Sequence, residues 1–379
     1  MIKIVARSAR KCLFVTFSLV LRWPTWFLLG LIRVFKPFDY LFLVYPGTDK
    51  DLDGYCPRWL AKSRLFRSKP QVGGVITKGS GGRGLVLVVP DTVKAFIKDP
   101  QIGRKTIKNL DRIRQLVGAK SIAIAGQLPG IMSRHRINLE NPFVVGNSGT
   151  VFCVMETVGR VMSLHGLMAG KFKTALVGVG FTGRLVLEAL KNDGHDIYGV
   201  DIKISHRGVL VGEEGIAALK TADMVIVLTP KGSDFLPYVG YLKPGCIVID
   251  DTHPKITQRP EEVHFYKVAM GMKGVKFLPR LPGYRSNWIP GCTVEAIYSA
   301  ATGNFNHTPQ AEFNRIAREL GFYAHLVVEE DTAPSSTPPP HEYIVPISIG
   351  WRPRHAGNRP ALSWLPLPVC RSVVSGACP

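Results

Sequence analysis

The chain of 379 residues contains few acidic residues and no paired cysteines. Its seven cysteines are scattered without a Cys-x-x-Cys pair, and its ten histidines form no cluster at the spacing of metal ligands. A disulfide framework and a metal site therefore find no support, and a reducing compartment is the simpler interpretation. Lys and Arg number 48 against 28 Asp and Glu, so the formal net charge is +20. Such an excess favours an anionic partner, either nucleic acid, anionic lipid or an acidic protein.

The sequence also lacks a recognised nucleic-acid-binding module, and its basic residues are not interleaved with aromatic ones. We therefore expect no nucleic-acid partner, which leaves a lipid surface or an acidic protein. With 46% hydrophobic residues the chain is able to bury a core, and its length points to two domains with appendages.

The N-terminal segment is basic and apolar. Residues 1–36 contain seven Lys or Arg and no acid, and they surround an apolar run at 12–32. Arg22 and Pro24 lie in the middle of that run, where a charge is costly and a helix kinks, and no small-residue cleavage site is evident. We predict that residues 1–37 associate with a membrane as an interfacial or hairpin-like anchor; a spanning helix and a buried core helix are the alternatives. The expected location is the cytoplasm, at the inner face of the membrane.

Composition and periodicity divide the rest of the chain. Strands alternate with helices from residue 38, which predicts an α/β fold with partly parallel sheets. Residues 332–379 hold ten prolines and show no sustained period, which is typical of disorder. The predicted organisation after the anchor is a substrate-binding α/β domain at 38–170, a doubly wound Rossmann-type domain at 171–288, helices at 289–330 that return to the substrate domain, and a disordered tail at 331–379.

A glycine motif follows the short apolar strand at 174–177. Gly178, Gly180 and Gly183 give the pattern G-x-G-x-x-G, a helix follows, and a second strand ends in Asp201. The first glycine allows a tight turn, the second lets a pyrophosphate approach the backbone, and the third lets helix and strand pack closely. Asp201 is placed to accept hydrogen bonds from ribose hydroxyls and to repel a 2′-phosphate, which favours NAD(H) over NADP(H). A glycine-rich turn without a ligand is the alternative.

Two later strands end in polar residues. The apolar stretch "ADMVIVL" ends at Thr229 and Pro230, and "CIVIDDTHP" places a second polar group, including His253, at another strand end. Ligands of open α/β sheets bind at the carboxyl ends of the strands. The predicted cofactor contacts are Gly178, Gly180, Phe181, Thr182, Gly183, Asp201, Thr229 and Pro230.

The order of several short motifs resembles a known family. "GQLPGIM", "GNSGTVFCVMETV", the Rossmann glycines, "VIDDTHPKI" and "PGCTVEAI" follow one another as in the long-chain acyl-(acyl-carrier-protein) reductases and their predicted-dehydrogenase relatives. The likeness covers about residues 38–328 and is sharper after Gly126. The matching positions are Gly146, Asn147 and Thr150 in the family's substrate-side loop, and Cys292, Glu295 and Ala296 in its Cys-x-x-Glu-Ala segment.

The resemblance implies an NAD(P)-dependent oxidoreductase that reduces a fatty acyl thioester to a fatty aldehyde. Cys292 is then the nucleophile: its thiolate attacks the thioester, and hydride from the nicotinamide releases the aldehyde. A cysteine at a helix N-terminus is expected to have a lowered pKa. The family uses NADPH, which opposes the preference for NAD(H) indicated by Asp201. Its partners would be the fatty acyl thioester and an acidic acyl carrier protein.

Each candidate catalytic residue also has a structural interpretation. Cys292 is either a nucleophile or a small buried residue that starts a helix. His253 is either a proton donor or a hydrogen-bonding loop residue. Asn147 and Thr150 either orient a carbonyl oxygen or the nicotinamide amide, or cap a helix. Cys153, within an apolar helix, is expected to be packing.

Two other functions remain open at this stage. One is an NAD-dependent dehydrogenase of a small hydroxy or amino acid, with a polar pocket, no covalent intermediate and a structural Cys292. The other is a membrane-associated protein that binds NAD without catalysis. The sequence leaves the oligomeric state, the acyl chain and its carrier undetermined.

Overall fold

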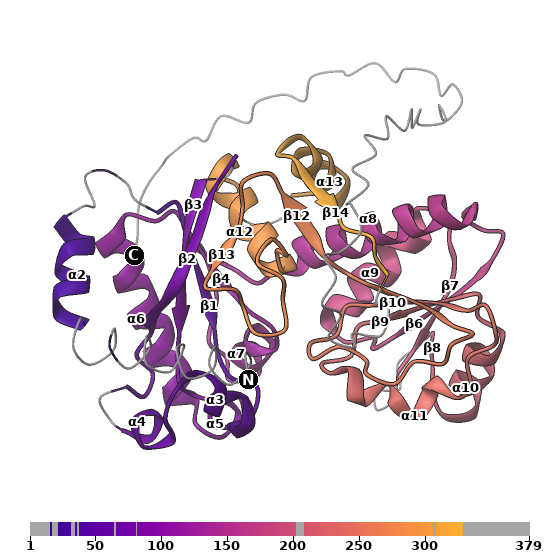
Figure 1. The fold of residues 1–379 in the computed structure, drawn as a ribbon, viewed down its shortest axis with the longest axis horizontal. Helices are drawn as coiled ribbons and strands as arrows, with labels where there is room; N and C mark the ends of the chain where they lie inside the picture. The colour runs from indigo at the N-terminus through magenta and orange to yellow at the C-terminus, as the bar shows by residue number, and fades with distance from the viewer. Residues whose placement is uncertain are drawn as a thin grey trace, which may run out of the picture. The chain divides into compact units, whose positions relative to one another are not determined.

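The computed structural model describes residues 16, 22–31, 35, 38–63, 66–80, 82–201, 208–305 and 308–328 (Figure 1). The chain forms two compact units, 1–331 and 332–379, and all described residues belong to the first. The predicted tail lies outside the described residues, as does much of the predicted anchor at 1–37. Within the described part, no helix combines the length and the apolar character needed to cross a bilayer.

The first sheet has six strands in the order β13-β2-β3-β1-β4-β5. Strands β3, β1, β4 and β5 are parallel, whereas β2 and β13 are antiparallel at one edge. β1 and β4 are buried along nearly their whole length, which explains their continuous apolar sequences. The strand bounds are β1 Tyr40–Val44, β2 Gln71–Gly79, β3 Gly82–Val88, β4 Ser121–Ile124, β5 Phe143–Val144 and β13 Phe277–Leu278.

Helices of the N-terminal part connect and flank this sheet. Helix α6 illustrates why they begin and end where they do. Asp99 caps its first turn by accepting a hydrogen bond from the Gln101 amide (3.0 Å), Pro100 occupies the first helical position, and Gly118 ends it in a left-handed conformation. The helices are α2 Arg22–Leu31, α3 Asp49–Tyr55, α4 Arg58–Lys62, α5 Val93–Lys98, α6 Pro100–Val117, α7 Leu128–Arg134 and α8 Asn147–His165.

The second sheet has seven strands in the order β15-β11-β10-β9-β6-β7-β8. All its pairs are parallel except that between β15 and β11. Numbered from β6, the parallel strands read 3-2-1-4-5-6, the order of dinucleotide-binding sheets, with the change of direction between β6 and β9. The bounds are β6 Lys173–Val177, β7 Asp196–Val200, β8 Val209–Leu210, β9 Met224–Val227, β10 Ile247–Asp250, β11 His264–Lys267 and β15 Val327–Val328.

The remaining elements complete an α/β fold with two parallel-rich sheets, which confirms the predicted fold class at this level. They are α9 Phe181–Asn192, α10 Gly212–Thr221, the short 3-10 helix Gly232–Asp234, α11 Leu236–Val239, β12 Met270–Met272, α12 Gly291–Thr302, α13 Gln310–Glu319 and β14 Phe322–Ala324. Helix α12 packs against β4 and β1 of the first sheet. Its contact with β4 includes a hydrogen bond from Ser121 Oγ to the Ala296 carbonyl (2.9 Å).

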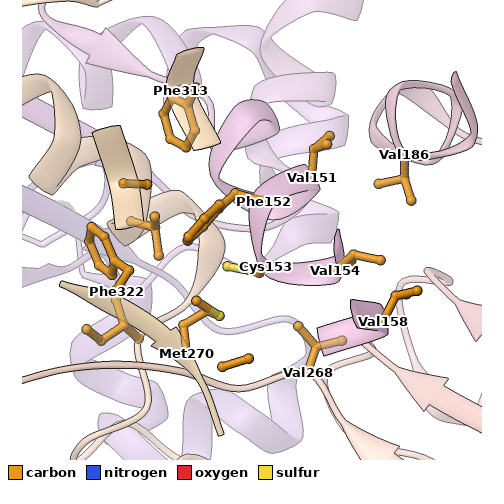
Figure 2. Close-up of a cluster of buried hydrophobic side chains, with 14 of the residues drawn as sticks. Val151, Phe152, Cys153, Val154, Val158, Val186, Val268, Met270, Phe313 and Phe322 are labelled. Carbon is orange, nitrogen blue, oxygen red and sulfur yellow. The ribbon is translucent and has the colours of Figure 1, made fainter. Parts of the chain in front are cut away.

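Helix α8 lies at the centre of the largest hydrophobic cluster (Figure 2). The cluster contains residues of both sheets, and α8 contacts α9 as well as α12. Phe152 is fully buried, with its ring centroid 6.2 Å from those of Phe313 and Phe322. Cys153 is 2% exposed, which confirms that it is a packing residue. Because α8 is held on all these sides, the loop that begins it has a defined position.

Candidate functional site

The glycine motif forms a tight loop between β6 and α9. Gly178 has φ +98°, and a Cβ there would lie 2.9 Å from the Leu228 carbonyl carbon; a Cβ on Gly183 would lie 2.1 Å from the Gly178 oxygen. A Cβ on Gly180 would meet no atom within 4 Å. The first and third glycines are therefore required by the protein's own packing, while the middle one faces open space.

The open side of this loop is the N-terminus of α9. Gly180 is the N-cap, no side chain caps the helix, and Phe181 is 74% exposed. Uncapped amide groups at a helix start attract phosphate oxygens, and the bare backbone at Gly180 leaves room for them. The residues present therefore fit the pyrophosphate of a dinucleotide.

Asp201 lies directly after β7 and is 7% exposed. Its Oδ2 accepts a hydrogen bond from the Val179 amide (2.9 Å), so this carboxylate holds the glycine loop in shape. Its contact with a ribose stays a prediction. Thr229 follows β9 by two residues, is 4% exposed, and donates a hydrogen bond to the Lys231 carbonyl (2.9 Å), which shapes the turn that continues through Pro230.

The turn after β10 is organised by a buried carboxylate. Asp250 is 1% exposed and accepts hydrogen bonds from the Thr252 amide (2.7 Å), the Thr252 hydroxyl (2.6 Å) and the Ile256 amide (3.0 Å). Lys267 Nζ donates to the Asp250 and Thr252 carbonyls, at 2.8 Å each, and lies 3.8 Å from Asp250 Oδ1. Asp250 thus holds the backbone of this turn in shape.

Asp251 is the carboxyl group of this site that titrates near neutrality. Burial raises its pKa to about 7, with the charge of Asp250 adding to the effect and Lys267 opposing it. Burial raises the pKa of the Tyr284 phenol, and the charges of Asp251 and Cys292 act in the same direction. Asp251, Tyr284 and Cys292 therefore interact electrostatically in one site.

His253 lies on the other side of Tyr284. The two rings have centroids 4.7 Å apart and planes inclined by 33°, and a Cβ on Gly283 would lie 2.5 Å from the imidazole. Partial desolvation of the imidazole, with Lys267 contributing, lowers the pKa of His253. Its role as a proton donor stays a prediction, and its visible function is to support the Tyr284 ring.

Cys292 is the second residue of α12, and this helix meets α8 at glycines. A Cβ on Gly146, which has φ +82°, would lie 2.6 Å from Cys292 Cβ, and one on Gly149 would lie 2.0 Å from the Gly291 oxygen. Only backbones without side chains approach each other this closely. The glycines that allow this close contact are visible in the sequence as "GNSG" and "PGC". The sequence does not show that the two segments meet, because they are at least 142 residues apart.

Glu295 explains why α8 begins where it does. Its side chain is 8% exposed, and Oε2 accepts a hydrogen bond from the Gly149 amide (3.2 Å). Burial raises its pKa, while hydrogen bonds from the amides of Gly149, Gly146, Ser148 and Val145 partly offset this. The glutamate of the Cys-x-x-Glu-Ala segment thus caps the N-terminus of α8 from a different helix, which holds Thr150 beside α12.

The Cys292 thiol differs from the expectation drawn from its helix position. Burial raises its pKa to about 12, and Glu295 contributes in the same direction, while the Thr293 amide only partly offsets them. The dipole of a helix start shifts a pKa modestly, whereas loss of water around the thiolate shifts it by several units. The thiol form therefore predominates at pH 7.

The first turn of α8 contacts both the glycine motif and the start of α12. Asn147 Oδ1 accepts a hydrogen bond from the Thr182 hydroxyl (3.0 Å), which joins the start of α8 to the start of α9. Thr150 lies against Gly291, since a Cβ on that glycine would be 2.5 Å from Thr150 Oγ1. The structure therefore brings Asn147 to Thr182, and Thr150 to the residue before Cys292.

Two tyrosines of this region were not predicted from the sequence. Tyr284 stands in the loop at 279–287, and Tyr45 follows β1 and accepts a hydrogen bond from the Leu128 amide (3.0 Å). Burial raises the pKa of both phenols, and Cys292 contributes in each case. Neither tyrosine is part of a recognisable motif, so only its position in the fold reveals it.

No family profile matches this chain, and no curated protein matches it. Among solved structures it is similar to the 3-hydroxyisobutyrate dehydrogenase of Mycobacterium tuberculosis with L-serine, at 24% identity and a TM-score of 0.20, covering 22% of this chain and 32% of the other. A D-isomer-specific 2-hydroxyacid dehydrogenase of Xanthobacter autotrophicus, in complex with NADPH and MES, has 20% sequence identity to this chain and a TM-score of 0.23. The match covers 33% of this chain and 63% of the other. The malic enzyme of Pyrococcus horikoshii has 15% sequence identity to this chain and a TM-score of 0.36. The match covers 77% of this chain and 83% of the other.

The chain thus spans about a third of the length of the first of these structures and just under two thirds of the second. Proteins of one fold carry many functions, and likenesses this distant assign none. The arrangement of the site itself has to supply the argument.

Proposed function

We propose that this protein is an NAD(P)-dependent oxidoreductase that acts on the carbonyl or alcohol group of a small hydroxy or amino acid without a covalent intermediate. The observation that carries the proposal is Asp251, which directly follows β10 at the carboxyl end of the strand and has a pKa of about 7, and whose charge acts on the buried phenol of Tyr284. A group that exchanges protons near neutral pH is suited to acid and base catalysis.

The cofactor would be held by the glycine loop and the strand ends around it. The amides at the start of α9 would bind the pyrophosphate, Asp201 a ribose, and the turn at Thr229 and Pro230 would lie on the nicotinamide side. A nicotinamide supplies or accepts hydride when it is bound. Asp201 supports a preference for NAD(H), and the family resemblance is the reason to test NADP(H) beside it.

The protein's own residues would manage the proton that accompanies hydride transfer. Protonated Asp251 would donate to the oxygen of a carbonyl that is being reduced, and the ionised form would accept the proton of an alcohol that is being oxidised. Tyr284 has a raised pKa, keeps its proton, and would orient the substrate oxygen by donating a hydrogen bond. His253 would hold the tyrosine ring in place.

The surroundings of Cys292 favour a small polar substrate. Its electrostatic neighbours include the phenols of Tyr45 and Tyr284 and the Glu295 carboxylate, none of which deprotonates a thiol. Its own raised pKa makes the thiolate scarce. Both observations support Cys292 as a structural residue at the contact of α8 with α12.

Acyl thioester reduction is the second candidate, for one specific reason. Cys292 is partly exposed and stands at the start of α12, beside the loop that contacts the glycine motif. A bound oxidised nicotinamide or a carbonyl dipole would lower the thiol pKa. The substrate would then be a fatty acyl thioester and the partner an acidic acyl carrier protein.

Intact-mass spectrometry separates the two candidates. The protein is incubated with a long-chain acyl thioester without nucleotide, beside Cys292→Ala and the buried-cysteine control Cys153→Ala. We expect no acyl adduct on any of the three, together with oxidation of small hydroxy or amino acids by NAD that survives in Cys292→Ala. An acyl-sized mass increase that only Cys292→Ala loses would establish the thioester mechanism instead.

The middle glycine gives a direct test of cofactor binding. Gly180→Ala should leave the melting temperature within about 2 °C of the wild type, because the added methyl group meets no protein atom. It should weaken NADH binding by at least about tenfold, because the methyl group lies where a pyrophosphate would approach the backbone. Fluorescence titration with NADH and with NADPH measures this. Wild-type affinity in the variant would place the dinucleotide elsewhere, and tight binding by a wild type that turns over no substrate would favour a non-catalytic NAD-binding protein.

A further inference from the structure

Helix α2 carries apolar side chains on two opposite faces. Leu29 is buried in the cluster of the first sheet, Trp26 packs against that cluster, and a Cβ on Gly30 would lie 3.1 Å from a methyl carbon of Leu116. This inner face attaches α2 to α6, and Figure 1 shows α2 alongside that helix. A helix held in this way lies on the protein surface.

The outer face of α2 is also apolar. Phe27, Leu28 and Leu31 are 68%, 56% and 57% exposed. At 100° per residue these three positions fall within an arc of about 100°, opposite Leu29. Phe35, which follows the helix, is 81% exposed. A contiguous group of large apolar side chains on one face marks a surface that binds something.

A basic stripe runs along α6, the helix against which α2 packs. Arg104, Lys105, Lys108 and Arg112 are all exposed on α6 and fall within one arc of about 100°. Arg112 lies one turn before Leu116, the residue that Gly30 contacts, so the stripe runs along α6 toward the attachment point of α2. The only acid of α6, Asp111, is paired with Arg114 at 2.8 Å.

We propose that the outer face of α2 and the basic stripe of α6 together form a docking surface for an anionic lipid bilayer. Aromatic and aliphatic side chains would enter the headgroup region, with the cations beside them at the lipid phosphates. The positive charge of the α6 stripe favours an anionic bilayer over the other molecules that could cover this surface. A second copy of this chain has the same positive charge, and an apolar segment of the chain itself would gain nothing from the cations.

This surface acts without a spanning helix, and it is independent of the proposed catalytic function. Its geometry places α2 flat along the membrane, because the opposite face of the helix is buried against α6. The first sheet would then be held next to the bilayer. Any substrate that partitions into lipid would be available to the protein there.

Vesicle flotation of the full chain tests the proposal. We expect binding to vesicles of phosphatidylcholine with phosphatidylglycerol, and at least about tenfold weaker binding to phosphatidylcholine alone. Phe27→Ser, Leu28→Ser and Leu31→Ser combined should reduce binding by at least about tenfold. Trp59→Ser is the matched control, since Trp59 is 66% exposed on α4 and should be neutral.

A second variant keeps the test sharp if the first fails to fold. Arg104→Gln, Lys105→Gln and Lys108→Gln combined change only exposed side chains, and should weaken binding to the anionic vesicles by about a hundredfold. The control variant removes the same charge from exposed positions at β6 and on α9, and should weaken vesicle binding far less. Its substitutions are Lys171→Gln, Lys173→Gln and Lys191→Gln. Wild-type binding by both test variants, or no vesicle binding by the wild type, would overturn the proposal. A dimer that the α2 variant dissociates would identify a second copy as the occupant and overturn it as well.

Discussion

Asp251→Asn should lower kcat for the oxidoreductase reaction by about 10² to 10⁴, the usual contribution of a general acid or base. The wild type should show a pH dependence with an apparent pKa near 7 that the variant lacks. Reduction of a carbonyl needs the protonated acid and should slow above pH 7, whereas oxidation of an alcohol needs the carboxylate and should speed up there. KM for the nucleotide should change little, because Asp251 is not assigned to cofactor binding.

The same variant should be more stable than the wild type at alkaline pH. The pKa of Asp251 rises from 3.8 in the unfolded chain to about 7 in the fold, so the folded state binds the proton more tightly. Its stabilising effect is complete below about pH 4 and is lost as the pH rises through 7. Asparagine stays neutral, so Asp251→Asn should gain about 2 kcal/mol at pH 8, after allowing for partial exposure, and almost nothing at pH 4.

Urea unfolding at the two pH values, together with steady-state kinetics, measures both effects. Glu261→Gln removes a carboxylate from an exposed loop and serves as the control, with wild-type kinetics and stability. Loss of activity without the pH-dependent gain in stability would mean that Asp251 is hydrogen-bonded and structural. Full activity in Asp251→Asn would contradict the proposed proton transfer altogether.

Gly149→Ala should destabilise the fold by about 3 kcal/mol. Its Cβ would lie 2.0 Å from the Gly291 oxygen and 3.0 Å from the Glu295 amide nitrogen. Both neighbours are backbone atoms of α12, so no side-chain rotation relieves the clash, and the two helices must separate. Separation also removes the hydrogen bond by which Glu295 caps α8, which adds about 1 kcal/mol.

Gly159→Ala in the same helix is the matched control. A Cβ there meets no atom within 4 Å, so alanine should stabilise the protein by up to about 1 kcal/mol through its higher helix propensity. Chemical denaturation of both variants gives the comparison. Equal stability of Gly149→Ala and Gly159→Ala would show that α8 and α12 do not meet as closely as described.

Local chemistry explains why the shape of the glycine loop between β6 and α9 was predictable. The turn at Gly178, the close contact at Gly183 and the acid at Asp201 all lie within one β-α-β unit, and their roles follow from steric rules that act over short distances. The parallel strands were equally readable, because strands buried on both faces are continuous apolar runs. Cys153 was predictable for a similar reason, since it stands within the apolar run Val151–Met155 of its helix.

The catalytic region was predictable only in part. Asn147, Thr150 and Cys292 were identified from a resemblance, and the structure places Asn147 beside the glycine loop and Thr150 beside α12. The expected low pKa of Cys292 was wrong for this structure, because a helix position is visible in a sequence and the loss of surrounding water is not.

By itself the sequence determined the α/β fold class, the dinucleotide-type loop and the basic charge, since each depends on composition, periodicity or neighbours along the chain. Only the tertiary structure decided that Glu295 caps α8, and that burial raises the pKa of Asp251 to about 7. These properties arise from burial and from contacts between residues far apart in the chain, such as Gly149 and Glu295, which are 146 positions apart. Desolvation and through-space charge act on distance in the folded molecule, and that distance is set by the packing of the whole chain.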